Sequence, residues 1–373
     1  MTTQMRVLVI GGGIGGMAAA IALRQRGRAV DLIDIDPDWR VYGAGLTITG
    51  PTLRAFRDLG LLDAIGKRGF LASGQRMFLF DGTPIGEQAP PPVEPGLPAS
   101  GGIMRPRLHQ IMSSEVRRLG AAVRLGIEVT DFKQATGAVV VTFSDGSAET
   151  YDLVVAADGI YSTTRAMLFP DAVAPVYTGQ MSWRVVAPRP AAMDKAEFFF
   201  GHAHTGGIIP CSDEEVYAFI LHPDPENRRV SEAEQPERLK KLMADFGGSM
   251  AVIRENIGPD SSILARPFEY ALQPRPWYLG RVVLIGDAAH ATTPHLASGA
   301  GIAVEDALVL TQELDKAADV PEALEAFTER RFERCRFVVE SSVAIGKRQL
   351  EGAPAEEIGM RMGQAMSFLA GAI

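Results

Sequence analysis

A glycine-rich run near the amino end constrains the fold of this chain more than any other feature. Residues 11–16 have the sequence GGGIGG and follow residues 7–10, a short apolar run typical of a buried strand. From residue 14 to residue 22, apolar residues recur at helical spacing. The glycines at the three fixed positions of G-x-G-x-x-G are Gly11, Gly13 and Gly16. Strand, tight turn and helix in this order predict a dinucleotide-binding βα unit.

Each of the three glycines has a separate expected role in this loop. Gly11 would permit the tight turn, Gly13 would let the backbone approach a pyrophosphate, and Gly16 would let the helix pack on the strand. A second strand-like run ends at Asp34, where a carboxylate can accept hydrogen bonds from ribose hydroxyls. The loop residues that we expect to contact a dinucleotide are Gly11, Gly13, Ile14, Gly15 and Gly16. This unit alone does not distinguish NAD from FAD.

The same segment admits a second interpretation. Residues 7–23 carry no charge and follow a single arginine, which resembles the core of a secretion signal or a short membrane span. Five of these residues are glycine, however, and the stretch is shorter than the ~20 apolar residues that a span needs. A second strand-like run follows at residues 30–35. We therefore expect a cytoplasmic protein that does not bind a membrane.

Length and composition exclude several classes of protein. A chain of 373 residues suggests two domains, and the proportions of 46% hydrophobic and 22% charged residues are ordinary for a globular protein. The net charge of −8 argues against a nucleic-acid partner. The two cysteines, Cys211 and Cys335, are too few for a disulfide scaffold or a metal cluster, so we expect no metal.

A second strand–glycine–aspartate unit lies far downstream. Residues 281–290, RVVLIGDAAH, form an apolar run that ends at Gly286-Asp287, and a helical pattern starts near residue 299. NAD binding would not require this second unit. FAD binding would, because the ribityl chain and isoalloxazine of FAD extend well beyond the pyrophosphate. Asp287 can accept a ribityl hydroxyl, and a helix start can stabilise the charge on reduced flavin. The backbone N–H groups that we expect at the flavin edge belong to Gly299, Ala300, Gly301 and Ile302.

A third segment, residues 152–165, has the sequence DLVVAADGIYSTTR. Alone it is better interpreted as a strand followed by a turn and a surface arginine. Together, GGGIGG, AADGIYSTTR and GDAAHATTPHLASGAG resemble, in this order and spacing, the single-component FAD-dependent aromatic hydroxylases (group A flavoprotein monooxygenases). Further similarity lies at residues 43–65, 105–108 and 323–335, so the resemblance covers most of the flavin-binding part and little of the remainder.

The resemblance implies an α/β fold. An FAD-binding, Rossmann-like domain of the glutathione-reductase type would carry an inserted antiparallel β-sheet substrate domain. The flavin domain would comprise residues 1–73, 102–174 and 276–373, and the substrate domain residues 74–101 and 175–275. From the sequence pattern we expect antiparallel strands over 175–222, a proline-rich loop over 84–98, and helices over 235–246 and 321–345.

The family also implies an activity and further cofactor contacts. The enzyme would use O₂ as the oxidant and NADH or NADPH as a transient hydride donor. It would hydroxylate a small aromatic or N-heteroaromatic substrate through a C4a-hydroperoxyflavin. Gly45 would lie at the cofactor, Arg105 would contact the phosphate and ribityl region, and Val129 would contact the adenine through its backbone. Asp158 and Arg165 would support the pyrophosphate side and the surface that NAD(P)H visits.

Substrate-binding residues are less constrained. His295 follows Pro294 at the expected flavin ring and could bind or deprotonate a phenol, although a histidine that only fills the loop is as good an interpretation. Arg184 could pair with a substrate carboxylate, with the flavin or with a surface acid. The other candidates lie on or beside strands of the substrate domain, where aromatic residues more often form the core: Phe199, His204, Tyr217 and Phe219.

Some alternatives stay open at this point. Residues 296–298, Leu-Ala-Ser, replace the glycine-containing turn that is usual in the family, and whether this change reshapes the pocket is left open by the sequence. An oxidase or reductase on the same fold, or a flavin-binding module without catalysis, would share the cofactor motifs. A halogenase would need a W-x-W-x-I-P stretch, and a disulfide oxidoreductase would need a close cysteine pair; neither pattern is present. The sequence is compatible with a monomer or a homodimer.

Overall fold

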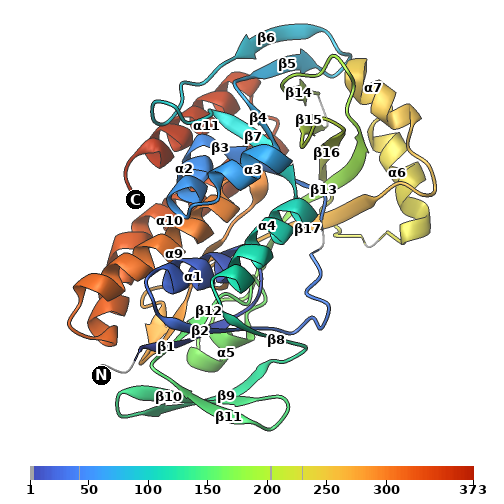
Figure 1. The fold of residues 1–373 in the computed structure, drawn as a ribbon. Coiled ribbons are helices and arrows are strands. Elements are labelled where there is room, and N and C mark those ends of the chain that lie inside the picture. Colours follow the sequence, from blue (N-terminus) through green and yellow to red (C-terminus); the bar gives the residue numbers. More distant parts are fainter. Residues whose placement is uncertain (1–3, 42, 202–203, 229) are drawn as a thin grey trace.

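The computed structural model describes residues 4–41, 43–201, 204–228 and 230–373 (Figure 1). Its central element is a six-stranded sheet in the order β18-β19-β12-β1-β2-β8, in which every pair except β18–β19 is parallel. Because this sheet is covered on both faces, β1 is a continuous apolar run with Val7, Leu8 and Val9 fully buried. The strands are β1 Arg6–Ile10, β2 Ala29–Asp34, β8 Ala122–Leu125, β12 Leu153–Ala156, β18 Tyr278–Leu279 and β19 Val282–Leu284.

Helices from both ends of the chain cover this sheet. α9 packs on α1, α2 and α10, so the first and last thirds of the sequence share one core. A separate three-stranded antiparallel sheet, β11-β10-β9, lies beyond β8 at the bottom of Figure 1. The helices are α1 Ile14–Gln25, α2 Gly50–Asp58, α3 Leu62–Arg68, α4 Arg105–Arg118, α5 Thr163–Leu168, α8 Asp287–His290, α9 Gly299–Lys316, α10 Val320–Leu350 and α11 Ala355–Ala370. The three strands are β9 Val129–Ala135, β10 Ala138–Phe143 and β11 Ala148–Tyr151.

A seven-stranded sheet forms the second part of the molecule, in the order β17-β13-β16-β15-β14-β5-β6. All of its pairs are antiparallel except β14–β5, which is parallel. Its strands are β5 Gln75–Leu79, β6 Pro84–Gln88, β13 Val176–Pro188, β14 Ala196–Phe200, β15 Thr205–Pro210, β16 Glu215–Pro223 and β17 Ile263–Leu272. A three-stranded sheet, β3-β7-β4, connects it to the flavin-binding part, with strands β3 Gly45–Thr49, β4 Phe70–Ala72 and β7 Ser100–Met104.

The two faces of the seven-stranded sheet have different partners. Met181, Trp183 and Val185 project into a hydrophobic core against α6 (Gln235–Leu242) and α7 (Gly248–Glu255). Since side chains alternate along a strand, Ser182 and Arg184 project from the opposite face. That opposite face packs near Ala44 and Met104 of the flavin-binding part. The sheet therefore presents its more polar face to the expected cofactor.

Several expected elements need correction. The segment 84–98, expected to be a loop, begins with strand β6, which pairs with β5 at the sheet edge. The expected helix over 235–246 ends at Leu242, and the expected helix over 321–345 continues to Leu350.

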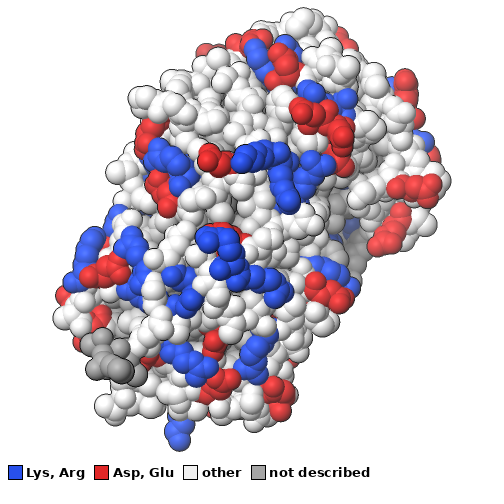
Figure 2. Space-filling view, in the orientation of Figure 1, with Lys and Arg blue, Asp and Glu red and all other residues white. Residues whose placement is uncertain are grey.

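In the described part of the chain, no helix is both long and apolar enough to cross a membrane. On the face in Figure 2, basic and acidic side chains are interspersed.

Candidate active site

Steric crowding shapes the glycine-rich turn between β1 and α1. A Cβ atom on Gly11 would lie 2.4 Å from the Ala157 carbonyl oxygen, and one on Gly16 would lie 1.8 Å from the Gly11 carbonyl oxygen. Gly11 also has φ +96°, a conformation that favours glycine. By contrast, a Cβ on Gly13 would meet no described atom within 4 Å. The turn is therefore closed on the protein side and open beside Gly13, where a phosphate group would need space.

Asp34 lies at the end of β2, directly beside this turn. Its Oδ2 accepts a hydrogen bond from the Gly12 N–H at 2.6 Å. The Trp39 indole N–H donates to the Gly12 carbonyl oxygen at 2.9 Å, and the His109 ring meets the indole edge to face. Burial lowers the pKa of His109. Sequence reasoning placed Asp34 correctly next to the turn but missed Trp39 and His109, which no motif identifies.

Asp158 and Arg165 hold the following turn and α5 together. Asp158 accepts hydrogen bonds from the Ser162 hydroxyl and from the Thr164 N–H, as a helix-capping carboxylate does. Arg165 is 3% exposed, and its guanidinium donates to the carbonyl oxygens of Ile160, Val173 and Ala288. Its side chain is therefore committed to buried carbonyl groups, and the expected support of the surface that NAD(P)H visits stays a prediction.

Arg105 begins α4 and points toward the second cofactor segment. A Cβ on Gly43 would lie 2.6 Å from the Arg105 Cδ, so the chain at Gly43 closely covers this side chain. Burial lowers the pKa of Arg105, and the nearby charge of Asp287 opposes that shift. Val129 is buried at the start of β9 and lies just after Ile127, whose N–H donates to the Asp34 carbonyl oxygen. Both residues thus lie next to a predicted cofactor segment.

Gly45 lies at a crowded contact between the two parts of the molecule. A Cβ on Gly45 would lie 1.9 Å from the Tyr217 Cδ1 and 2.7 Å from the Cys211 sulfur. The missing side chain makes room for the seven-stranded sheet, called the substrate sheet below, to pack against β3. Its described neighbours therefore show that Gly45 permits packing between the two parts, and a contact of its backbone with the cofactor stays a prediction.

Asp287 opens onto a cavity of about 850 Å³ between the two parts of the molecule. It follows Gly286, which has φ +56°, and it is the first residue of α8. Although its carboxylate faces the cavity, protein surrounds its other sides, and this burial raises its pKa against the opposing charges of His290 and Arg105. Residues that line the cavity include Tyr161, Met181, Arg266, Glu269, Asp287 and Thr292.

The start of α9 lacks a side-chain cap. The first hydrogen bond of the helix runs from the Ile302 N–H to the Ser298 carbonyl oxygen, so the three preceding N–H groups have no acceptor within the helix. The Ser298 hydroxyl donates to the Leu296 carbonyl oxygen and does not cap the helix. A Cβ on Gly301 would lie 2.3 Å from the Thr52 Oγ1, so Gly301 also permits close packing of α2. An uncapped helix start suits a ligand edge that carries negative charge.

His295 does not occupy the position expected for a substrate-binding group. Its ring is 8% exposed, its Nδ1 lies 2.9 Å from the Thr293 Oγ1, and Phe268 packs against it edge to face. A Cβ on Gly346 of α10 would lie 2.6 Å from its Cε1, so the ring packs against α10. Burial lowers its pKa to about 4. Neither His295 nor Pro294 is among the residues that line the cavity, and the loop-filling interpretation is favoured for His295.

Three of the substrate candidates share the sheet face that points to the flavin-binding part. Arg184 on β13 is opposite Phe219 on β16, and the rings of Phe219 and Tyr217 have centroids 6.0 Å apart. The Tyr217 hydroxyl pairs with the Thr47 hydroxyl, and burial raises the pKa of Tyr217 to about 12. Within the described residues, no carboxylate forms an ion pair with Arg184, whose pKa is lowered by burial and by the charges of Arg105 and Arg266.

None of the five substrate candidates is among the residues that line the cavity. Phe199 is fully buried, stacked on Phe78 and in edge contact with Phe246, and belongs to the hydrophobic core. The His204 Nδ1 lies 3.4 Å from the His222 Nδ1, and neither ring lines the cavity. Burial and His204 lower the pKa of His222 to about 4. The structure therefore places Phe199 in the hydrophobic core, while substrate contact by His204 stays a prediction.

The geometry of these segments fits FAD. Three observations support the fit: the open space beside Gly13, the Asp287 carboxylate at the cavity, and the uncapped start of α9. These features lie on β-strand ends and helix starts from opposite ends of the chain, as a long, extended cofactor requires.

Comparisons with known proteins agree with this geometry. The family model described as "FAD binding domain" matches residues 4–342. The 2-heptyl-3-hydroxy-4(1H)-quinolone synthase of Pseudomonas aeruginosa is 32% identical over 351 residues, covering 92% of this chain and 89% of that protein. The aurachin C monooxygenase/isomerase of Stigmatella aurantiaca is 31% identical over 356 residues, covering 93% and 90%.

Solved structures show the same fold. HpxO of Klebsiella pneumoniae, complexed with FAD and uric acid, superimposes with a TM-score of 0.88 at 24% identity and covers 100% of this chain and 98% of its own. A tetrameric 2-methyl-3-hydroxypyridine-5-carboxylic acid oxygenase has a TM-score of 0.80 at 23% identity, covering 95% and 94%. On the family match and the curated relatives, this chain belongs to the FAD-dependent aromatic hydroxylase family and is an FAD-dependent monooxygenase.

Proposed function

We propose that this monooxygenase hydroxylates a small N-heteroaromatic or aromatic ring in the cavity between Asp287 and the substrate sheet, with NADH or NADPH as hydride donor. The cavity of about 850 Å³ is the observation that carries the proposal, since the flavin-side turns and the sheet edge both line it. The names of three similar proteins refer to a quinolone, to urate and to a hydroxypyridine carboxylic acid, which supports a nitrogen-containing ring.

The chain's own residues would bind and orient the cofactor. The open turn at Gly13 would hold the pyrophosphate, Asp34 the ribose, and Asp287 the ribityl chain. The N–H groups at the start of α9 would bind the flavin edge. When bound, FAD supplies the electron transfer to O₂, and the protein supplies position and a site with little water.

The sheet face that carries Arg184, Tyr217 and Phe219 does not line this cavity, and it would orient a substrate that reaches beyond the cavity toward Arg105. With a pKa of about 12, the Tyr217 phenol stays protonated at neutral pH and can donate a hydrogen bond to a ring oxygen or nitrogen. Phe219 supplies an apolar surface, and Arg184 can pair with an acidic group. Arg266 and Thr292, which sequence reasoning did not identify, line the cavity and would complete the binding surface.

A panel of N-heteroaromatic and phenolic acids tests this proposal. Each compound is scored for stimulation of NADH or NADPH oxidation, with H₂O₂ and product mass measured in the same reaction. A correct substrate should give a product heavier by one oxygen atom. Stimulated oxidation with complete conversion to H₂O₂ and no product for any compound would instead favour the oxidase alternative. The predicted domain boundaries, the cytoplasmic location and the monomeric or dimeric state stay predictions.

A further inference from the structure

A single buried carboxylate joins the two cofactor segments at the carboxyl-terminal end of the chain. Asp306 lies on α9 and is fully buried. Its Oδ2 accepts hydrogen bonds from the Gly286 N–H at 2.9 Å and from the His290 Nε2 at 2.6 Å. One side chain of α9 thus holds both ends of the short segment that contains Asp287.

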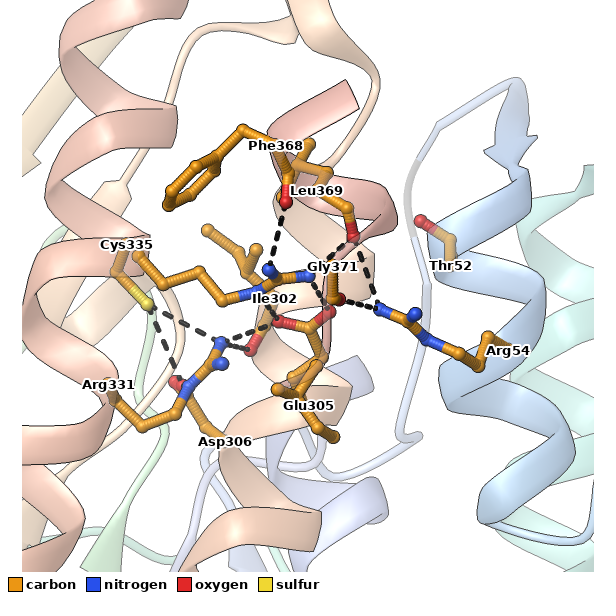
Figure 3. Close-up of polar contacts among 12 residues, drawn as sticks. Thr52, Arg54, Ile302, Glu305, Asp306, Arg331, Cys335, Phe368, Leu369 and Gly371 are labelled. Carbon is orange, nitrogen blue, oxygen red and sulfur yellow. Dashed lines mark hydrogen bonds and ion pairs between the residues drawn. The ribbon is translucent and has the colours of Figure 1, made fainter. Parts of the chain in front are cut away.

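Arg331 of α10 fixes this carboxylate from the other side, as Figure 3 shows. Its Nε donates to the Asp306 Oδ1 at 2.8 Å, and its Nη2 donates to the Ile302 carbonyl oxygen at 3.1 Å. His290 and Arg331 outweigh the effect of burial and lower the pKa of Asp306 to about 2. The carboxylate is therefore ionised and held between two cationic groups, one from each side.

We propose that Asp306 is a positioning residue for FAD, which sets the turn at Gly286-Asp287 against the start of α9 so that both can contact the flavin together. The inference rests on the proposed assignment of Asp287 and the start of α9 to the cofactor. It goes beyond that assignment because Asp306 itself, being fully buried, would not touch the flavin.

A metal site is a poorer interpretation of the same group. The ligand atoms of His290, Asp306 and Cys335 lie within 4.8 Å of one another, as a metal site would require. The Arg331 guanidinium, however, occupies the Asp306 Oδ1 and also lies 3.5 Å from the Cys335 sulfur. A positive charge thus already stands where a cation would bind, and the Oδ2 is committed to Gly286 and His290.

The neighbouring acid, Glu305, provides a matched control. It lies on the same helix, is 2% exposed, forms two 2.8 Å hydrogen bonds with Arg334 and, like Asp306, pairs with Arg331, here at 2.9 Å. Arg334 in turn donates to the Leu369 carbonyl oxygen, and Arg54 of α2 donates to the carbonyl oxygens of residues 369–371, so Glu305 serves the end of α11 (Figure 3). None of its hydrogen bonds or ion pairs within the described residues reaches residues 286–290.

The test compares Asp306→Asn with Glu305→Gln, each purified and stripped of flavin. FAD affinity is measured by titration of flavin fluorescence, and visible circular dichroism reports the flavin environment after reconstitution. Both variants should lower the thermal unfolding midpoint of the apoprotein, since each removes a buried charge. Asp306→Asn should weaken FAD binding roughly tenfold or more and alter the flavin dichroism, whereas Glu305→Gln should change the affinity less than about twofold.

Equal losses of FAD affinity in the two variants, or no loss in Asp306→Asn, would overturn the proposal. If Asp306→Asn does not fold, His290→Gln removes one of the two segment contacts and should still weaken FAD binding more than Glu305→Gln does. Asp287→Asn tests the assignment of Asp287 to the cofactor separately from the positioning role of Asp306. Unchanged FAD affinity in Asp287→Asn would refute the assignment of Asp287, while a loss there combined with equal effects at 305 and 306 would refute only the positioning role.

Discussion

The flavin-binding turn depends on backbone groups, whereas the substrate sheet depends on side chains. At the turn after β1, the missing side chains of Gly11 and Gly16 create the geometry, and backbone N–H groups are the expected ligands. On the substrate sheet, the side chains of Arg184, Tyr217 and Phe219 create the surface on a backbone that pairs regularly. A backbone site tolerates almost no substitution, while a side-chain site can change its ligand by exchanging a few residues.

The largest expected effect tests the backbone site. Gly16→Ala places a Cβ 1.8 Å from the Gly11 carbonyl oxygen and should destabilise the apoprotein by at least about 3 kcal/mol, or prevent folding. Gly13→Ala is the control, because no described atom lies within 4 Å of its Cβ; it should change apoprotein stability by less than about 0.5 kcal/mol. Chemical denaturation of both apoproteins and FAD titration make the measurement. Similar stability losses in the two variants would contradict a turn that is closed only on the protein side.

His295 gives a pH-dependent prediction. Since its pKa falls from 6.5 to about 4 on folding, the folded state prefers the neutral ring. Its contribution to stability is present above pH 6.5 and should be lost as the pH falls toward 4, by up to about 3 kcal/mol. In His295→Gln this part of the acid-induced loss should disappear, as measured by urea denaturation at pH 7 and pH 4. A stability difference between variant and wild type that is equal at both pH values would refute the prediction.

Tyr217→Phe tests the side-chain site with a smaller change. The variant removes the hydroxyl that pairs with Thr47 and keeps the ring, so FAD affinity should stay within about twofold of the wild type. If the hydroxyl binds substrate, kcat/KM should fall about 5- to 30-fold, which corresponds to roughly 1–2 kcal/mol. Phe199→Leu is the core control: it should lower stability and leave kcat/KM nearly unchanged. A loss of FAD affinity in Tyr217→Phe would instead show that the Tyr217 hydroxyl contributes to the flavin site.

The smallest expected effect concerns the turn before α9. Ala297 has φ +48°, in the left-handed region that a non-glycine residue rarely adopts. Ala297→Gly should stabilise the protein by up to about 1 kcal/mol, as the relief of this conformation exceeds the added chain entropy. Ala300→Gly, inside the helix, should have the opposite sign. Unfolding midpoints of the two variants decide the point, and destabilisation by Ala297→Gly would show that the turn is not strained.

The predictability of each region follows from the same contrast. The unit β1–α1–β2 was predicted almost to the residue, because G-x-G-x-x-G fixes a turn geometry by sterics that leave few alternatives. The position of Asp34 beside the turn follows from its place at a strand end. Strand β6 was missed because prolines usually break strands, but β6 lies at a sheet edge, where proline is tolerated.

Side-chain orientation was the main source of error at the site. His295 and Phe199 lie on correctly placed elements, yet one packs against α10 and the other into the core. No local pattern tells which way a single ring in a loop or strand will point, since that depends on elements more than 50 residues away. Asp306 was invisible for the same reason: its hydrogen-bond partners lie in two other segments, residues 286–290 and α10.

The parallel pairing of β5 with β14 has a consequence for how the chain folds during synthesis. These strands are more than one hundred residues apart, and β1 must likewise wait for β12 before its sheet can grow. Folding therefore depends on non-local pairing, which is slow and leaves the early hairpin β5–β6 without its neighbour during synthesis. Neither half can be excised as a contiguous fragment, so expression of residues 175–275 alone should yield a sheet that lacks two strands and aggregates at the exposed edge of β14.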